Sequence, residues 1–89
     1  MTDTTTEQVY AYRIEVRDPV TCIWDLEDEA AKGVESYDGS PEEYAREVLR
    51  NRMDDLRFLG LKGRWRVLVW ENEEGSPDEV AAWAEVFIP

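Results

Sequence analysis

Histidine is absent from this chain of 89 residues, and cysteine occurs once, as Cys22. Without histidine, no imidazole can act as a general base or as a metal ligand. The single thiol allows no disulfide within the chain, and no histidine is available to activate it as a nucleophile. A glycine-rich phosphate-binding loop is missing as well. These absences predict a protein that is not an enzyme and that binds neither a metal nor a cofactor.

Long hydrophobic runs are also missing. No stretch approaches the roughly 18 apolar residues that a membrane-spanning helix requires. The first eight residues are polar, unlike the apolar centre of a secretory signal. Together with the lone cysteine, these features lead us to expect a cytoplasmic protein. The chain has 2 lysines against 8 arginines, a usage that is typical of GC-rich genomes and favours a bacterial or phage origin.

Basic residues are few. The chain carries 21 acidic and 10 basic residues, which gives a formal net charge of -11. Such a protein would be repelled by the phosphates of nucleic acid and by an anionic membrane surface, so neither is an expected direct partner. The charge favours a basic protein partner, or a surface that imitates the charge of nucleic acid.

The clearest pattern that is present is a helix between Ser40 and Gly60. Ser40 can cap its first turn, Glu43 completes a capping box, and Pro41 occupies the first helical position. Gly60 provides the left-handed residue that ends the helix. The apolar residues share one side of a helical wheel: Tyr44, Ala45, Val48, Leu49, Met53, Leu56 and Leu59. This side must pack against another layer of the fold.

The segments on either side of the helix predict strands. Residues 9–17 alternate between apolar and polar side chains, which is typical of a half-buried strand. Residues 64–71 and 79–88 form two further strands that are joined by the polar turn 72–78. These elements predict an α+β fold. It is a two-layer sandwich in which one main helix packs on a three- or four-stranded, mostly antiparallel sheet with the element order β-(β)-α-β-β.

Residues 18–39 are harder to assign. Their pattern allows a strand or a buried connection at 20–24, a short helix at 25–32 and a loop at 33–39. If the strand 9–17 lies beside the strand that follows the helix, a right-handed crossover would make the two parallel.

The division of the chain is simple. Residues 1–7 are expected to form a disordered tail, and residues 8–89 a single α+β domain.

One face of the predicted sheet meets the helix, and the opposite face is the predicted interaction surface. It combines aromatic and arginine side chains, which are typical of interface hot spots. The candidate residues of this outer sheet face are Arg13, Arg66, Leu68, Trp70, Trp83 and Phe87. Three interpretations stay open: residues 18–39 cover the face with Ile23, Trp24 and Leu26, a second copy binds it to form a homodimer, or a foreign protein binds it.

Acidic residues gather in two clusters that predict an acidic surface. Neither has the glycine-containing, alternating spacing of a calcium loop, so both are interpreted as solvated carboxylates. Presented in rows on a small domain, they could instead mimic a phosphate backbone. The residues are Asp25, Glu27, Asp28, Glu29, Glu71, Glu73 and Glu74.

Arginines on the helix allow two interpretations. Arg46, Arg50 and Arg57 form a stripe beside acidic residues, which is either a solvated face with ordinary ion pairs or a docking surface for an acidic partner. Arg52 lies among the apolar helix residues instead. It either reaches past the sheet, reflects a rotation of the helix, or pairs with a buried acid, in which case it would mark a functional site.

Composition and pattern together favour a small, acidic, non-catalytic protein–protein interaction module. Its partner would be another protein or a second copy of the chain, bound through the aromatic face and steered by the acids. The alternative is an acidic nucleic-acid mimic that inhibits a DNA- or RNA-handling protein, of the kind that a phage or a mobile element would encode.

Overall fold

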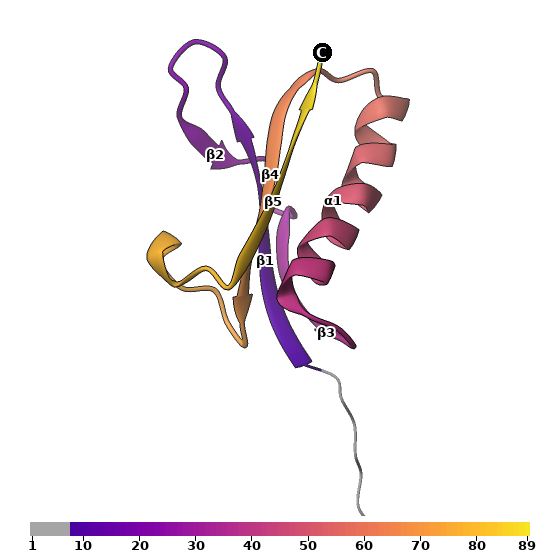
Figure 1. Cartoon of the computed structure of the whole chain (residues 1–89). Helices are drawn as coiled ribbons and strands as arrows, with labels where there is room; N and C mark the ends of the chain where they lie inside the picture. Colours follow the sequence, from indigo (N-terminus) through magenta and orange to yellow (C-terminus); the bar gives the residue numbers. More distant parts are fainter. Residues whose placement is uncertain (1–7) are drawn as a thin grey trace, which may run out of the picture.

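The structure, a computed structural model, describes residues 8–89, so the predicted tail 1–7 lies outside the described residues. One helix packs against one face of a five-stranded antiparallel sheet (Figure 1), which confirms the predicted α+β fold with slightly more strands than expected. The elements in chain order are β1 (Gln8–Arg17), β2 (Trp24–Leu26), β3 (Lys32–Tyr37), α1 (Pro41–Phe58), β4 (Gly63–Glu71), the 3-10 helix η1 (Pro77–Glu79) and β5 (Ala82–Ile88).

The strand order of the sheet is β2-β1-β4-β5, and β3 pairs with β1 beside β2. Every pairing is antiparallel, and Tyr12 of β1 lies opposite Val69 of β4 and Gly33 of β3. The expected parallel pairing of the first strand with the strand after the helix is therefore wrong. The strand that leads into the helix is β3, and β3 and β4 run parallel to each other with β1 between them.

β2 and β3 behave as two parts of one strand that runs antiparallel to β1. They are separated by residues 27–31, which bulge out of the sheet: Glu27 donates its N–H to the Ile14 carbonyl at 3.0 Å, and Ile14 donates to the Ala31 carbonyl at 2.7 Å. The short helix allowed at 25–32 and the loop expected at 33–39 are both wrong. β3 shows little hydrophobic alternation because most of its residues are exposed at the sheet edge.

Both ends of α1 follow the local sequence signals. Ser40 accepts a hydrogen bond from the Glu43 N–H through its side chain, and the Glu43 carboxylate accepts one from the Ser40 N–H, each at 3.1 Å. The hydrogen bonds that the Glu43 carboxylate accepts from the Ser40 N–H and hydroxyl hold the pKa of Glu43 below its ordinary value of 4.5. At the other end, Gly60 has φ 71°, and the N–H of Leu61 bonds to the Leu56 carbonyl at 3.0 Å. This is the Schellman arrangement that a left-handed glycine permits.

The core lies between α1 and the sheet. Tyr44, Ala45, Leu49 and Leu56 of the helix are buried there, as predicted, but Leu59 is 61% exposed because it follows the last helical residue. The sheet contributes alternate residues of β1, β4 and β5, among them Ile14, Trp65, Val67, Val69 and Ala82.

A cluster of four tyrosines holds the first turn of the helix to β1 and β3. Its members are Tyr10, Tyr12, Tyr37 and Tyr44. The Tyr44 ring stacks on Tyr10 with centroids 5.4 Å apart and lies 5.0 Å from Tyr37. Tyr44 donates its hydroxyl hydrogen to the carboxylate of Glu35 on β3, and burial together with this bond raises the pKa of Tyr44. These contacts join β3, which was not predicted from the sequence, to α1, which was predicted.

The connection between β4 and β5 lies over the opposite face of the sheet. In Figure 1 this segment, which contains η1, projects away from the side that α1 occupies. Within residues 8–89, no helix is long and apolar enough to cross a membrane.

Candidate protein interaction surface

Two of the six predicted interaction residues are buried. Leu68 and Trp70 form a small cluster with Ala11, covered on the outer side by Val80 and the β4–β5 connection. The Trp70 indole donates its Nε1–H to the Ser76 carbonyl at 2.9 Å, which fixes the connection over the ring. The connection at residues 72–81 thus covers this part of the outer face, whereas β2 and β3 of the segment 18–39 extend the sheet at its edge.

Two further predicted residues, Arg13 and Arg66, are engaged with one buried carboxylate. Glu15 is only 6% exposed and accepts from Arg13 Nε and from Arg66 Nε, each at 2.7 Å. The Arg66 guanidinium also lies 4.3 Å from the ring centre of Trp24, so β2 does reach this face with one side chain. Arg13 lies 3.6 Å from Glu74 of the β4–β5 connection. This cluster joins β1, β2 and β4 across the outer face.

The last two predicted residues, Trp83 and Phe87, remain open to solvent. Trp83 is 66% and Phe87 56% exposed, and both lie on β5, the strand at the free edge of the sheet. Arg64 lies 5.1 Å above the Phe87 ring and pairs with Glu85 at 3.1 Å. Of the predicted interaction residues, the two aromatic ones that stay exposed therefore both lie on the edge strand; we refer to Trp83 and Phe87 as the aromatic strip.

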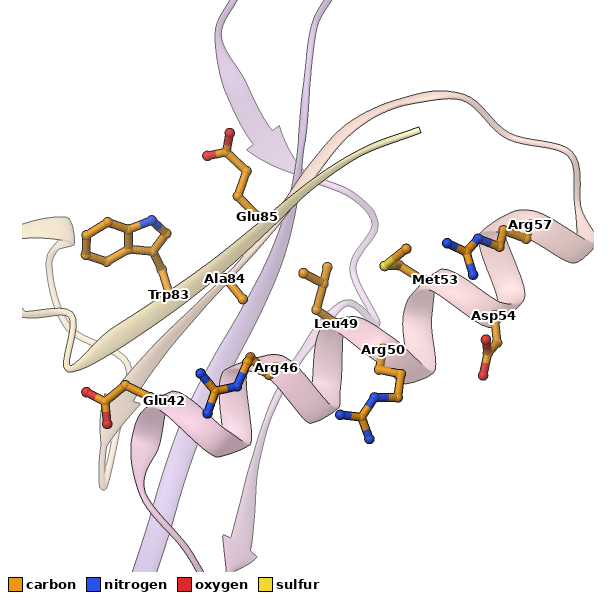
Figure 2. Close-up of a pocket in the computed structure, with 10 residues that line it drawn as sticks. All are labelled: Glu42, Arg46, Leu49, Arg50, Met53, Asp54, Arg57, Trp83, Ala84 and Glu85. Carbon is orange, nitrogen blue, oxygen red and sulfur yellow. The ribbon is translucent and has the colours of Figure 1, made fainter. Parts of the chain in front are cut away.

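A shallow groove of about 550 Å³ runs between this edge strand and the helix. Figure 2 shows its walls: Ala84 points from β5 toward the charged side of α1, whereas Trp83 and Glu85 line the rim and project to the other side of the strand. The apolar floor comes from Leu49 and Met53. The helix wall is lined by charged residues: Glu42, Arg46, Arg50, Asp54 and Arg57. The stripe of three arginines predicted from the sequence lies along this groove.

Six of the seven predicted acidic surface residues are exposed. Asp25, Asp28 and Glu29 lie in or next to β2 at one edge of the sheet. Glu71, Glu73 and Glu74 surround the β4–β5 connection together with Glu79 and line a second hollow there.

Glu27 is the exception, because its side chain is only 11% exposed. It accepts from Arg52 Nε at 2.7 Å and from the Trp65 indole at 2.8 Å. Of the explanations left open for Arg52, the pairing with a buried acid is therefore correct. The bonds join the bulge at residues 27–31 to α1 and β4. The cluster of Glu27, Arg52 and Trp65 therefore stabilises the packing on the inner side of the sheet.

The carboxyl groups with a shifted pKa include three helix-cap or turn residues. The pKa values of Asp18, Glu43 and Glu79 are all lowered, chiefly by hydrogen bonds from backbone N–H groups. A lowered pKa is the opposite of what a carboxylic general acid requires. In the described part of the chain, no three carboxylate or thiol groups gather closely enough to hold a metal ion, and Cys22 is exposed and unpaired.

Comparison with known proteins gives no relative. The sequence matches no protein-family model, no curated protein and no solved structure. Sequence reasoning missed the central position of Glu15 and the groove along β5. The alternation of 9–17 did place Glu15 on the same face as Arg13, but its pairing with Arg66 depends on the register of β1 with β4.

Proposed function

We propose that this protein is a cytoplasmic, non-catalytic protein–protein interaction module that binds its partner through β5. The observation that carries the proposal is the aromatic strip, in which Trp83 and Phe87 stand exposed on a free edge strand. Exposed tryptophan beside arginine is the usual composition of an interface hot spot. Partners would be anchored by the aromatic rings and steered by the surrounding charges.

The groove next to the aromatic strip also supports partner binding at the β5 edge. Leu49 and Met53 provide apolar contact, and Arg46 and Arg50 stand at its rim. The outer sheet face behind it is occupied by the buried Glu15 cluster and by the β4–β5 connection. A partner that uses the predicted aromatic residues must therefore approach at the β5 edge.

The test is a pull-down with tagged protein from a lysate of the native host, at low and at high salt. Wild-type protein should retain a protein partner at high salt. Trp83→Arg should weaken that retention about thirtyfold, the effect of losing one tryptophan hot spot. Phe58→Arg is the matched control, because Phe58 is 90% exposed but lies on α1 outside the groove. Equal retention by wild type and Trp83→Arg would contradict the proposal.

The acidic mimic is a second candidate, favoured by the hollow that Glu71, Glu73 and Glu74 line at one end of the sheet. Their carboxylates could occupy the phosphate-binding site of a DNA- or RNA-handling protein. Such binding would depend on charge and would weaken steeply with salt. Capture of a nucleic-acid enzyme or regulator at low salt only, with no effect of Trp83→Arg, would favour this candidate over the first.

A further inference from the structure

The two edges of the sheet differ in how well they are protected against pairing with another strand. The β2–β3 edge is interrupted by the bulge at 27–31 and carries Lys32 and Glu35. Bulges and charges of this kind prevent edge-to-edge association. β5 is a regular strand of seven residues with a single charged side chain, Glu85. The β5 edge is therefore protected against pairing only by this one charge and not by a bulge.

The register of the sheet identifies the backbone groups that point to this free edge. In an antiparallel sheet, successive residues direct their N–H and C=O groups to opposite neighbours. Asn72 donates to the Val9 carbonyl, so even-numbered residues of β4 face β1 and odd-numbered ones face β5. Since Val69 pairs with Ala82, the even-numbered residues of β5 face β4. The N–H and C=O groups of Trp83, Glu85 and Phe87 therefore point outward.

The outward-facing residues of β5 can pair with the same residues of a second copy. If β5 pairs with an antiparallel second copy centred on Glu85, Trp83 of one copy lies opposite Phe87 of the other, twice in the dimer. Aromatic pairs across strands stabilise such ladders. The two Glu85 carboxylates would meet at the centre, where each keeps its own pairing with Arg64. The aromatic strip is then covered without any foreign partner.

The helix is placed to follow this pairing. α1 packs over β4 and β5 about equally. With neighbouring strands roughly 4.8 Å apart, the two helices of such a pair would lie about 10 Å apart, a normal distance for packed helices. They would run antiparallel, because the strands beneath them do. The small side chains of Ala82 and Ala84 leave room below the helices.

Charges along the groove wall match in this antiparallel arrangement. Their order along α1 is acidic at Glu42, basic at Arg46 and Arg50, acidic at Asp54 and basic at Arg57. Reversing one helix sets Glu42 against Arg57 of the other copy and Arg46 against Asp54, each twice. Only Arg50 lies opposite a like charge, which is Arg50 of the other copy. The charges along the groove of one copy thus complement those along the groove of a second copy.

We infer that the protein forms a homodimer in which the β5 strands pair antiparallel into one continuous sheet and the α1 helices lie side by side. This rests on the proposed function, since it uses the same strand and names a second copy as the partner. It differs from dimerisation through the outer sheet face, which the Glu15 cluster and the β4–β5 connection occupy.

Sedimentation equilibrium of the purified protein, from low to high micromolar concentration, tests the inference. Wild type should sediment as a dimer. Glu42→Arg and Arg57→Glu should each weaken the dimer about tenfold, because each turns two attractive contacts into repulsive ones. The double variant Glu42→Arg/Arg57→Glu restores attraction and should return to near the wild-type affinity. A merely structural role of either residue would not give this rescue.

Glu85→Pro removes an outward N–H without removing a hydrogen bond to β4, and it should abolish the dimer. Glu85→Ala is the matched control, which keeps the N–H and should still dimerise. Circular dichroism establishes that every variant is folded. A monomeric wild type at all concentrations, or a dimer that Glu85→Pro and the charge reversals leave unchanged, would overturn the inference. In the first case, retention of a foreign protein through Trp83 would leave the proposed function standing.

Discussion

Glu15→Leu should lower the free energy of unfolding by about 2–3 kcal/mol. The Glu15 carboxylate is buried and accepts hydrogen bonds from Arg13 and Arg66, so its loss leaves two cations facing each other without a counter-charge. Breaking a buried pair costs roughly 3–5 kcal/mol. The expected value is smaller because both arginine side chains are about one quarter exposed and can be partly hydrated. Urea denaturation monitored by tryptophan fluorescence measures it.

Two further variants separate the charge from the packing. Glu15→Gln keeps the shape of the side chain and should cost less than Glu15→Leu, since its amide oxygen still accepts a hydrogen bond. Combining Glu15→Leu with Arg13→Leu and Arg66→Leu removes all three charges and should recover part of the loss. A Glu15→Leu protein as stable as wild type would show that the cluster contributes nothing net to folding.

Tyr44→Ala should destabilise the protein by about 3–5 kcal/mol, the largest effect we expect from a single substitution. Tyr44 is 3% exposed, stacks on Tyr10, and bonds to Glu35 on β3. Truncation opens a cavity between the helix start and the sheet and also removes the bond from the helix to Glu35 of β3, which stays paired with β1. Because small domains are stable by only about 5–15 kcal/mol, thermal unfolding should occur at a clearly lower temperature.

Tyr44→Phe is the matched control for this substitution. It keeps the ring and loses only the hydroxyl bond to Glu35, whose carboxylate can be hydrated, so the cost should be about 1 kcal/mol. If Tyr44→Ala cost no more than Tyr44→Phe, the packing of the tyrosine cluster would not be what holds β3 and the helix together.

The features that could be predicted from the sequence are those that depend on neighbouring residues. The capping box of Ser40 and Glu43 and the glycine at position 60 act within one helical turn, so the residues themselves encode them. The alternation in β4 and β5 likewise separated Leu68 and Trp70, which were assigned to the outer face, from their neighbours Val67 and Val69, which face the helix. The α+β class follows from these elements.

The features that could not be predicted depend on register and on the path of loops. The pairing of Glu15 with Arg66 joins positions 51 residues apart and needs the alignment of β1 with β4. The burial of Trp70 depends on where residues 72–81 cross the sheet, which no local pattern specifies. β3 was missed because its exposed edge position removes the hydrophobic alternation that identifies a strand. Arg52 was the one long-range feature with a sequence signal, a charge among apolar helix residues.

The most direct test of binding through the β5 edge is amide hydrogen exchange, measured by NMR at low and at high protein concentration. The amides of Ala84 and Val86, which face β4, should be protected at both concentrations. Those of Trp83, Glu85 and Phe87 should exchange quickly in dilute protein and become protected as the concentration rises. Equal, rapid exchange of these three amides at both concentrations would contradict the pairing of β5 with a second copy.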